Sequence, residues 1–392
     1  MVFPERFSNL PVATWPRLRA LLDVPTKAAE TINMTIGEPR HAFPAFVGDV
    51  LAANLQTFGK YPANNGSDAL LAAIGVYLKR RYDLDVDAGQ ILALNGTREG
   101  LYNAAMALCP ETKNGQTPLI LTPNPFYQVY AVAALSVGAE ARYVPATPAT
   151  GNLPDFAGLP PDVLDRTAIA YACSPANPQG AVADRAYWRT LIGLAEKHDF
   201  QIFADECYAE IYRDTPPVGA LEVAVEMGAD PDRVVIFHSL SKRSNLPGLR
   251  SGFCAGGVAS IARMRSLRAY AGAPLPEPLQ AVAAHAWADD THVVENRALY
   301  HAKYEIADQI FGDVAGYISP QAGFFLWLPV DNGEAAAVKL WQETGVRTLP
   351  GAYLSQDTNG SNPGDKFIRV AMVAPTQELQ RGLTLIRDCL YD

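Results

Sequence analysis

Two charged side chains stand directly after short apolar runs of the sequence. Asp205 follows the run 201–204, and Lys242 follows the run 234–238 on a short serine-rich loop, with Arg250 eight residues later. A carboxylate at the end of a buried strand costs free energy unless a cation or several donors meet it. A lysine whose pKa is lowered is a usable nucleophile and base near neutral pH. Taken singly, Asp205 could instead bond to loop amides and Lys242 could be solvated, so both interpretations stay open here.

Two further segments indicate anion binding. Gly96, Thr97 and Arg98 follow an apolar run and open a predicted helix, where free N–H groups favour a phosphate. The pattern Gly-x-Gly-x-x-Gly of dinucleotide sites is missing there, and a glycine–threonine pair before a helix is often only a cap. Arg369 lies in an apolar run and therefore requires a carboxylate, either from a ligand or from a structural ion pair.

Several motifs follow one another in a definite order. They are Asn177-Pro178 with Gly180, Asp205-x-x-Tyr208, Ser239-x-Ser241-Lys242 with Arg250, and Arg369. The spacing is 28 residues from Asn177 to Asp205, 37 more to Lys242 and 127 more to Arg369. This ordered set resembles the fold-type I aminotransferases, which use pyridoxal 5′-phosphate. The resemblance runs over nearly the whole chain, from Ile36 to Arg369.

The resemblance implies what the central residues do. Lys242 resembles the lysine that holds the cofactor as a Schiff base and that, once a substrate amine displaces it, moves a proton as base and then acid. Asp205 resembles the carboxylate that pairs with the pyridine nitrogen and keeps it protonated. Asn177 and Tyr208 match positions that donate hydrogen bonds to the phenolic oxygen of the ring. The expected catalytic residues are therefore Lys242, Asp205 and Tyr208.

A stacking residue and a phosphate site are implied in the same way. Tyr127 matches the aromatic residue that stacks on the ring, with a core tyrosine as the alternative. Arg98 is expected to offer its backbone N–H, with its side chain in solvent. The residues expected around the phosphate are Gly96, Thr97, Arg98, Ser239, Ser241 and Arg250.

Three positions are expected to contact the substrate, and one the neighbouring subunit. Arg369 matches the arginine that binds the substrate α-carboxylate, and Asn177 and the backbone of Gly37 help to hold that group. Tyr61 looks like the tyrosine that reaches the phosphate of the neighbouring subunit. The resemblance thus implies a homodimer with shared active sites.

The residues of two predicted loops point to a particular class of substrate. The segments 37–41 and 241–252 most resemble the bacterial N-succinyl-diaminopimelate aminotransferases of lysine biosynthesis, which use glutamate as the amino donor. Arg40 and Arg243 are further cations that either meet the distal carboxylates of the substrate or lie in solvent or near the phosphate. The alternative is an aspartate or broad-specificity aminotransferase. Many aspartate aminotransferases read the side-chain carboxylate with a partner-subunit arginine, and 273–280 contains none.

Two other classes share parts of this pattern. Pyridoxal-dependent lyases and decarboxylases use the same lysine and aspartate, but an arginine that clamps the carboxylate disfavours its loss as carbon dioxide. Ligand sensors built on this fold carry a winged DNA-binding domain first, and the 36 residues before Gly37 leave no room for one. A transaminase is therefore expected.

The elements that position these residues read as an α/β chain. Continuous apolar runs separated by helical stretches predict a mainly parallel sheet covered on both faces, and the family resemblance implies the seven-stranded type. The tail, with a long helical stretch at 279–311, predicts a smaller α+β unit. We expect an N-terminal arm at 1–44, a large cofactor-binding domain at 45–273 and a small domain at 274–392. The predicted strands are 91–94, 119–121, 167–172, 201–204, 234–238, 324–328, 347–349 and 367–370, and the predicted helices include 100–108, 184–198 and one that begins at Thr376.

Composition narrows the class further. The 392 residues are 49% hydrophobic and 19% charged, which is enough to bury a core. The net charge of −9, without a basic run, disfavours nucleic acid as a partner. No apolar stretch approaches the roughly 20 residues of a membrane span, and no secretory signal is expected. Five scattered cysteines and six unclustered histidines predict a reduced cytoplasmic protein without a metal site.

Overall fold

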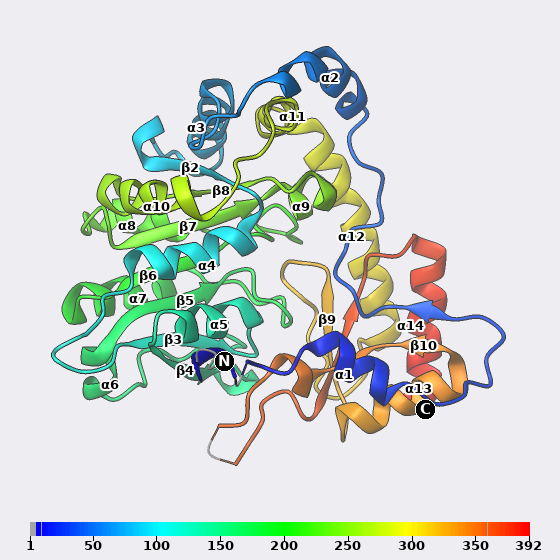
Figure 1. The fold of residues 1–392 in the computed structure, drawn as a ribbon. Coiled ribbons are helices and arrows are strands. Elements are labelled where there is room, and N and C mark those ends of the chain that lie inside the picture. The colour runs from blue at the N-terminus through cyan, green and yellow to red at the C-terminus, as the bar shows by residue number, and fades with distance from the viewer. Residues whose placement is uncertain (1–4, 9, 359) are drawn as a thin grey trace.

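The computed structural model describes residues 5–8, 10–358 and 360–392. Its largest element is a seven-stranded sheet in the order β2-β8-β7-β6-β5-β3-β4 (Figure 1). The strands from β7 through β4 pair in parallel, whereas β8 runs antiparallel to both of its neighbours. The strands are β2 Ile91–Leu94, β3 Leu119–Asn124, β4 Glu140–Pro145, β5 Thr167–Cys173, β6 Gln201–Asp205, β7 Val234–Ser239 and β8 Gly252–Ala255. The predicted mainly parallel α/β fold is thereby confirmed.

Alternate residues of each central strand face opposite helical layers. In β2, Ile91 and Ala93 belong to one hydrophobic core, whereas Leu92 and Leu94 belong to another. This alternation follows from the two-residue period of a strand. Both faces are apolar, so the strand reads as a continuous apolar run, which is why the sequence reveals it. β4 was missed because its side chains are mostly half-buried or exposed at the sheet edge.

Helices cover both faces of the sheet (Figure 1). α3, α7, α8 and α11 contribute to the first core, and α4, α5 and α10 to the second. The helices are α1 Thr14–Leu21, α2 Phe46–Asn54, α3 Asp68–Tyr82, α4 Thr97–Leu108, α5 Gln128–Ser136, α6 Pro161–Arg166, α7 Arg185–His198, α8 Ala220–Met227, α9 Leu240–Arg243, α10 Val258–Ala271, α11 Glu277–Ala288, α12 Thr291–Phe311, α13 Gly333–Thr344 and α14 Thr376–Leu390. Short 3₁₀ turns lie at Glu5–Phe7, Leu55–Gly59, Ala88–Gln90, Pro148–Thr150, Pro247–Leu249 and Gly351–Leu354.

A third core lies around an antiparallel sheet in the order β11-β12-β9. Here β9 is Phe325–Pro329, β11 is Leu349–Pro350 and β12 is Phe367–Ala371. The N-terminal segment joins this unit, because β1 (Ile32–Asn33) pairs in parallel with β10 (Val346–Arg347). The division at 44 and 273 stays a prediction, and α11 packs against α2 and α3 beside the large sheet.

The predicted helix 279–311 is wrong as a single element. The chain breaks between α11 and α12, where the Asp289 carboxylate accepts hydrogen bonds from the backbone N–H groups of Thr291 and His292 at 3.1 and 3.3 Å. An aspartate that bonds to nearby backbone favours a helix start over a helix interior. None of the described helices is both long and apolar enough to span a membrane.

Candidate active site

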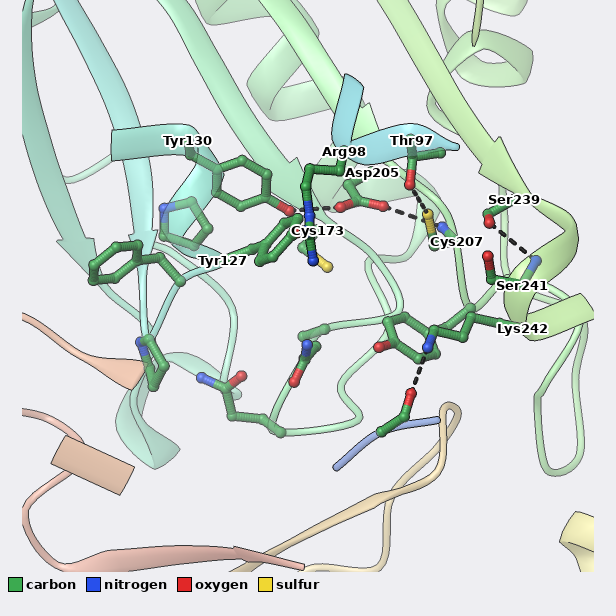
Figure 2. Close-up of a pocket in the computed structure, with 18 of the residues that line it drawn as sticks. Thr97, Arg98, Tyr127, Tyr130, Cys173, Asp205, Cys207, Ser239, Ser241 and Lys242 are labelled. Carbon is green, nitrogen blue, oxygen red and sulfur yellow. Dashed lines mark hydrogen bonds between the residues drawn. The ribbon is translucent and has the colours of Figure 1, made fainter. Parts of the chain in front are cut away.

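A cavity of about 340 Å³ lies beyond the carboxyl ends of β5, β6 and β7 (Figure 2). This is where open parallel sheets bind their ligands. Side chains reach it from the large sheet, from α4 and α9, and from the N-terminal segment. The expected site residues that line it are Gly37, Thr97, Arg98, Tyr127, Asn177, Asp205, Tyr208, Ser239, Ser241, Lys242 and Arg250. Gly96, Arg369 and Tyr61 are not among the lining residues, but Gly96 lies against Arg250 and Arg369 donates to Asn177, and both of these line the cavity.

Asp205, the last residue of β6, is a buried carboxylate with 6% of its surface exposed. Tyr130 donates its hydroxyl to Oδ2 at 2.7 Å, and the backbone N–H of Cys207 donates to Oδ1 at 3.3 Å. No cation pairs with it among the residues that the structure describes. Burial and the Asp205 charge raise the pKa of Tyr130, which keeps that hydroxyl a donor. Tyr130 was not expected from the sequence, where its signal is its place three residues after Tyr127.

Lys242 lies on the four-residue helix α9, directly after β7. The Ser239 hydroxyl caps this turn by accepting from the Ser241 N–H at 3.1 Å. The Lys242 ammonium donates to the Gly37 carbonyl and lies 5.2 Å from the centre of the Phe324 ring. Burial, opposed in part by neighbouring thiol and carboxylate groups, lowers the pKa of Lys242 to about 8. A pKa of about 8 leaves roughly a fifth of this amine neutral near pH 7.4, far more than in an ordinary lysine, and that neutral fraction can act as nucleophile or base.

The start of α4 and Arg250 give the cavity groups that can hold an anion. Gly96 caps α4 with φ +85°, and a Cβ placed there would lie 2.3 Å from Nη2 of Arg250. Glycine therefore allows the Arg250 guanidinium to lie against the start of the helix. Nη1 and Nη2 of Arg250 donate to the carbonyls of Pro247 at 2.7 Å and Asn95 at 3.3 Å. Free helix N–H groups beside a guanidinium form an electropositive cradle for a phosphate.

Arg369, on β12, is 5% exposed and has no ion pair within the described part of the chain. It donates to Asn177 Oδ1 at 3.1 Å and to the Thr35 carbonyl at 2.8 Å, while its Nε has no partner. The guanidinium lies 4.2 Å from the centre of the Phe325 ring. Burial lowers the pKa of Arg369 to about 10. A structural ion pair, the alternative weighed above, is not what the described residues show.

A family model, "Aminotransferase class I and II", matches residues 29–386. The chain belongs to this family. A relative from Streptomyces rimosus, a 4-dedimethylamino-4-oxo-anhydrotetracycline transaminase, is 30% identical over 89% of this chain and 90% of its own. An LL-diaminopimelate aminotransferase from Dehalococcoides mccartyi is 29% identical over 99% of both chains.

Solved aminotransferases have the same fold as this aminotransferase. One from Neisseria meningitidis superposes with a TM-score of 0.93 at 36% identity, covering 98% of this chain and 99% of the other. A probable N-succinyldiaminopimelate aminotransferase from Thermus thermophilus superposes with a TM-score of 0.83 at 25% identity, covering 96% and 100%. The predicted aminotransferase fold is thus confirmed.

Enzymes of this family depend on pyridoxal 5′-phosphate, and the cavity of this aminotransferase fits that group. Asp205 is a buried carboxylate that lacks a cationic partner among the described residues, as a protonated ring nitrogen would provide. Lys242 supplies an amine of lowered pKa, and the start of α4 with Arg250 supplies an anion cradle. Among the described residues there is no group of acidic, histidine and cysteine side chains suited to a metal ion.

The side chain of Arg98 is exposed, as expected, but it also has a partner in the cavity wall. Its Nε donates to the Tyr127 hydroxyl at 2.7 Å, and both residues line the cavity (Figure 2). The pair forms because Arg98, in the first turn of α4, faces the start of α5, where Tyr127 is the N-cap residue. The aminotransferase therefore carries a guanidinium in the cavity wall that pairs with no carboxylate among the described residues.

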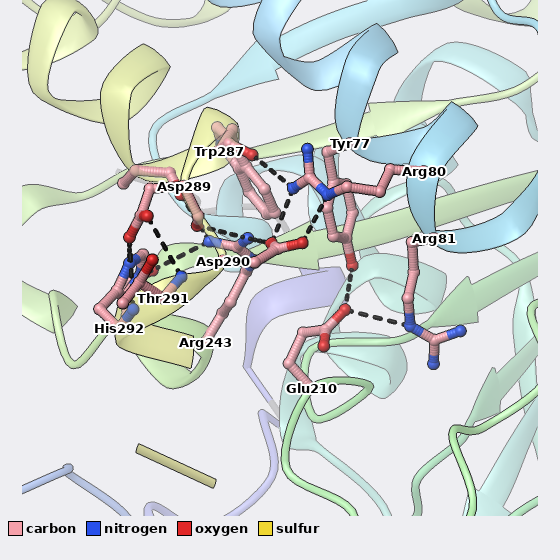
Figure 3. Close-up of polar contacts among 12 residues, drawn as sticks. Tyr77, Arg80, Arg81, Glu210, Arg243, Trp287, Asp289, Asp290, Thr291 and His292 are labelled. Atoms are coloured by element: carbon pink, nitrogen blue, oxygen red, sulfur yellow. Dashed lines mark hydrogen bonds and ion pairs between the residues drawn. The ribbon is translucent and has the colours of Figure 1, made fainter. Parts of the chain in front are cut away.

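Two cations suggested for the distal carboxylates lie elsewhere. Arg243 is buried on the far side of α9, where it donates to the Ala286 and Asp289 carbonyls and pairs with Asp290 at 2.6 Å (Figure 3). Arg40 pairs with Glu378 at 2.7 Å. Neither lines the cavity, so the expectation that they meet the substrate is not supported.

Tyr61 is fully exposed and has no contact with the cavity of its own chain. It lies between the short 3₁₀ turn Leu55–Gly59 and the start of α3. A residue that acts only on the neighbouring subunit is exposed in a single chain, so this position agrees with the expectation without testing it. The shared dimeric site stays a prediction.

Proposed function

We propose that this pyridoxal-dependent transaminase transfers the amino group between glutamate and N-succinyl-2-amino-6-oxopimelate, in the diaminopimelate branch of lysine biosynthesis. The residues of the segments 37–41 and 241–252 support the proposal, as do a relative and a solved structure whose names refer to diaminopimelate compounds. The observation that carries it is a set of cations around the cavity that no described carboxylate neutralises.

The cofactor roles that the family resemblance implies are compatible with where the chain's own residues lie. When bound, pyridoxal 5′-phosphate supplies an aldehyde that condenses with amines and a ring that accepts electrons. Lys242 Nζ would take a proton from the substrate α-carbon as a base and give it up as an acid to the aldehyde carbon that the cofactor supplies. Asp205, oriented by Tyr130 and the Cys207 N–H, holds the ring nitrogen in its protonated form. Tyr208 and Asn177 border the same cavity and orient the ring oxygen.

The α-carboxylate of the substrate binds near Arg369. The guanidinium already donates to Asn177 and to the Thr35 carbonyl, which fixes its plane, and it has an unpartnered Nε. Gly37 follows two residues after Thr35 and places its backbone at the cavity wall. A carboxylate held by arginine is poorly disposed to leave as carbon dioxide, so this geometry favours transamination over decarboxylation.

The distal carboxylates require cations farther from Lys242. Arg98 is one of these cations, in the cavity wall itself. A second cavity, of about 610 Å³, adjoins the first, since Trp15 and Ile36 line both. Arg19 and Arg347 line this second cavity, and the described residues offer no ion pair to either. A long acceptor with two remote carboxylates can therefore extend from Arg369 past Trp15 towards these arginines.

A panel of keto-acid acceptors with glutamate as donor tests the substrate. We expect kcat/KM for the succinylated acceptor to exceed that for oxaloacetate by at least about tenfold, the worth of one charge-assisted hydrogen bond. A preference for oxaloacetate would overturn the proposed substrate in favour of an aspartate or broad-specificity enzyme. No turnover with any acceptor would overturn the assignment as a working transaminase.

The second cavity is tested by the double variant Arg19→Gln/Arg347→Gln. We expect its KM for the succinylated acceptor to rise about tenfold, while the glutamate half-reaction is unchanged. The matched control is Arg17→Gln on the same helix α1, because Arg17 pairs with Glu334 at 2.9 Å and lines neither cavity. An unchanged KM in the double variant would remove these two arginines from the proposal.

A homodimeric, cytoplasmic enzyme is part of the same proposal. Its support is the exposed Tyr61 and the absence of any disulfide among the five cysteines. Hybrid dimers test the part that Tyr61 takes in the homodimer.

A further inference from the structure

Lys303, on α12, is fully buried, with 0% of its surface exposed. Its ammonium nitrogen lies 2.7 Å from Nε2 of His41, and no carboxylate pairs with it in the described parts of the chain. Burial, together with the charge of Arg40, lowers the pKa of Lys303 to about 7. A buried amine without an acidic partner is costly to keep. Its position relative to the active site shows what it contributes.

The direction of every hydrogen bond around Lys303 can be assigned. Asn296 Oδ1 is an acceptor, so His41 Nδ1 carries the proton that faces it, and Nε2 accepts from Lys303 when that lysine is protonated. Nδ1 then donates to Asn296 Oδ1 at 2.9 Å. The side-chain amide of Asn245 donates to the same oxygen at 3.0 Å. A protonated Lys303 therefore favours the histidine tautomer that holds Asn296 in one orientation.

Asn296 connects two segments that meet at Lys242. His41 is four residues after Gly37, whose carbonyl accepts the hydrogen bond from the Lys242 ammonium. Asn245 is three residues after Lys242 and also donates to the Ala42 carbonyl at 3.2 Å. The chain from Lys303 through His41 to Asn296 thus links α12 both to the segment that carries Gly37 and to the loop that carries Lys242.

The Gly37 segment is held at its other end by Arg369, which donates to the Thr35 carbonyl at 2.8 Å. Between these two attachments, Gly37 has no side chain of its own to fix it. The charged and titratable groups around Lys303 are His41 and Arg40 from this segment and Tyr300 from α12, whose ring centre is 5.0 Å from the ammonium. Glu378 of α14 pairs with Arg40 and not with Lys303.

We propose that Lys303 is a positioning residue for the transamination: through His41 and Asn296 it holds the Gly37 carbonyl against the amine of Lys242. The proposal rests on the role assigned to Lys242 under the proposed function. Lys303 itself touches neither cavity wall, so it acts only through these two residues.

The variant Lys303→Met tests this, because methionine fills the space of the lysine without donor or charge. In the holoenzyme we expect kcat to fall about tenfold, since the proton-transferring amine is misplaced, while KM for glutamate changes less than about twofold because Arg369 is intact. A rise in KM by the same factor as the fall in kcat, or no change in either constant, would overturn the proposal. The control is Lys339→Met, whose lysine likewise donates to one neutral acceptor, the Cys389 carbonyl at 2.6 Å, far from the site.

A second measurement does not use turnover. Trace acylation of the full chain without cofactor, read at Lys242 by mass spectrometry, gives the pH midpoint of that amine. The Gly37 carbonyl favours the charged amine, so losing it should lower the midpoint by about 0.5 to 1 pH unit in Lys303→Met. His41→Leu should produce the same shift, and the double variant no more than either one. An unchanged midpoint in Lys303→Met would overturn the proposal.

The two measurements separate this proposal from the one on which it rests. If the wild-type enzyme turns over no acceptor, the proposed function fails, yet acylation still reports whether Lys303 affects the Lys242 amine. If turnover is normal and the midpoints of variant and wild type coincide, only the role of Lys303 fails.

Discussion

Buried charges that the described residues leave uncompensated mark the functional residues of this enzyme. Asp205 lacks a cation, Arg369 lacks a carboxylate, and Lys242 has a carbonyl as its polar partner. Each arrangement costs free energy in the ligand-free chain. A ring nitrogen, a substrate carboxylate and a condensed aldehyde would remove these costs one by one, which supports the binding roles proposed for these three residues.

The lowered pKa of Lys242 leads to a prediction on pH. Only the neutral amine attacks an aldehyde, and its fraction rises with pH until the pKa is passed. With a pKa of about 8 in place of 10.5, the rate at which the cofactor-free protein takes up pyridoxal 5′-phosphate should rise about tenfold per pH unit up to about 8 and level off above it. Stopped-flow absorbance over pH 6–10 measures this; a rate still rising at pH 10 would contradict a buried, perturbed amine.

The same reasoning applied to Arg369 gives a second prediction at this scale. Arg369→Lys keeps the charge but loses the two-pronged geometry that donates to Asn177 and Thr35. KM for glutamate should rise about 10- to 100-fold, while cofactor affinity changes less than about threefold. Spectroscopic cofactor titration beside steady-state kinetics separates the two effects. Equal losses in both would show that the arginine is structural.

At the scale of elements, the start of α4 shows how a helix end becomes a binding site. The first turn of this twelve-residue helix offers free N–H groups and the partial positive charge of the helix N-terminus. Gly96 lets Arg250 lie against that turn. Neither α4 nor Arg250 alone would form the cradle. Their approach depends on β8, which runs beside β2 and carries the segment after Arg250 back along the sheet.

Replacing the glycine tests this arrangement. Gly96→Ala places a methyl group against Nη2 of Arg250 and should weaken cofactor binding at least about tenfold, besides costing about 1 kcal/mol in stability for its positive φ. Gly138→Ala is the matched control, since its φ is +73° and nothing lies within 4 Å of the added Cβ. Thermal denaturation and cofactor titration of both variants should show similar losses of stability but a loss of affinity only in Gly96→Ala. Equal cofactor affinity in the two would contradict the cradle.

For the whole molecule, the site forms where the two units of the chain meet. Asp205 ends β6 of the large sheet, Lys242 lies on α9 directly after β7, and Arg369 lies on β12 of the smaller sheet, while Gly37 comes from the N-terminal segment (Figure 1). Tyr61 is exposed in the single chain, and we propose that it completes the site of a second chain.

Hybrid dimers test that last point. Lys242→Ala and Tyr61→Ala homodimers should both have little activity at limiting cofactor, the first without its base and the second without a phosphate contact from each neighbour. A hybrid of the two has one site with both defects and one with neither, so the purified hybrid should regain about half of wild-type activity. Differently tagged subunits, co-expressed and purified through both tags, provide the measurement. Confirmed hybrids without regained activity would show that the sites are not shared.

The sequence alone determined the central strands and the order of the chemical motifs. Strands covered on both faces are apolar throughout, and residues at strand ends are recognisable because polar groups follow apolar runs; both signals are local. Asp205, Lys242 and Arg369 are therefore recognisable as candidates from their sequence neighbours alone. The break between α11 and α12 was missed because apolar periodicity continues across it. The break itself is held by the Asp289 carboxylate, which bonds to two backbone N–H groups at the start of α12.

Only the tertiary structure decided where the remaining charged groups point. Arg243 is next to Lys242 in sequence, yet it faces Asp290 on the far side of a single turn of helix. Tyr130 meets Asp205 across 75 residues, and Lys303 meets His41 across 262. Such pairs depend on which faces of distant elements pack together. That packing is a property of the assembled core, so no local spacing in the chain could have revealed them.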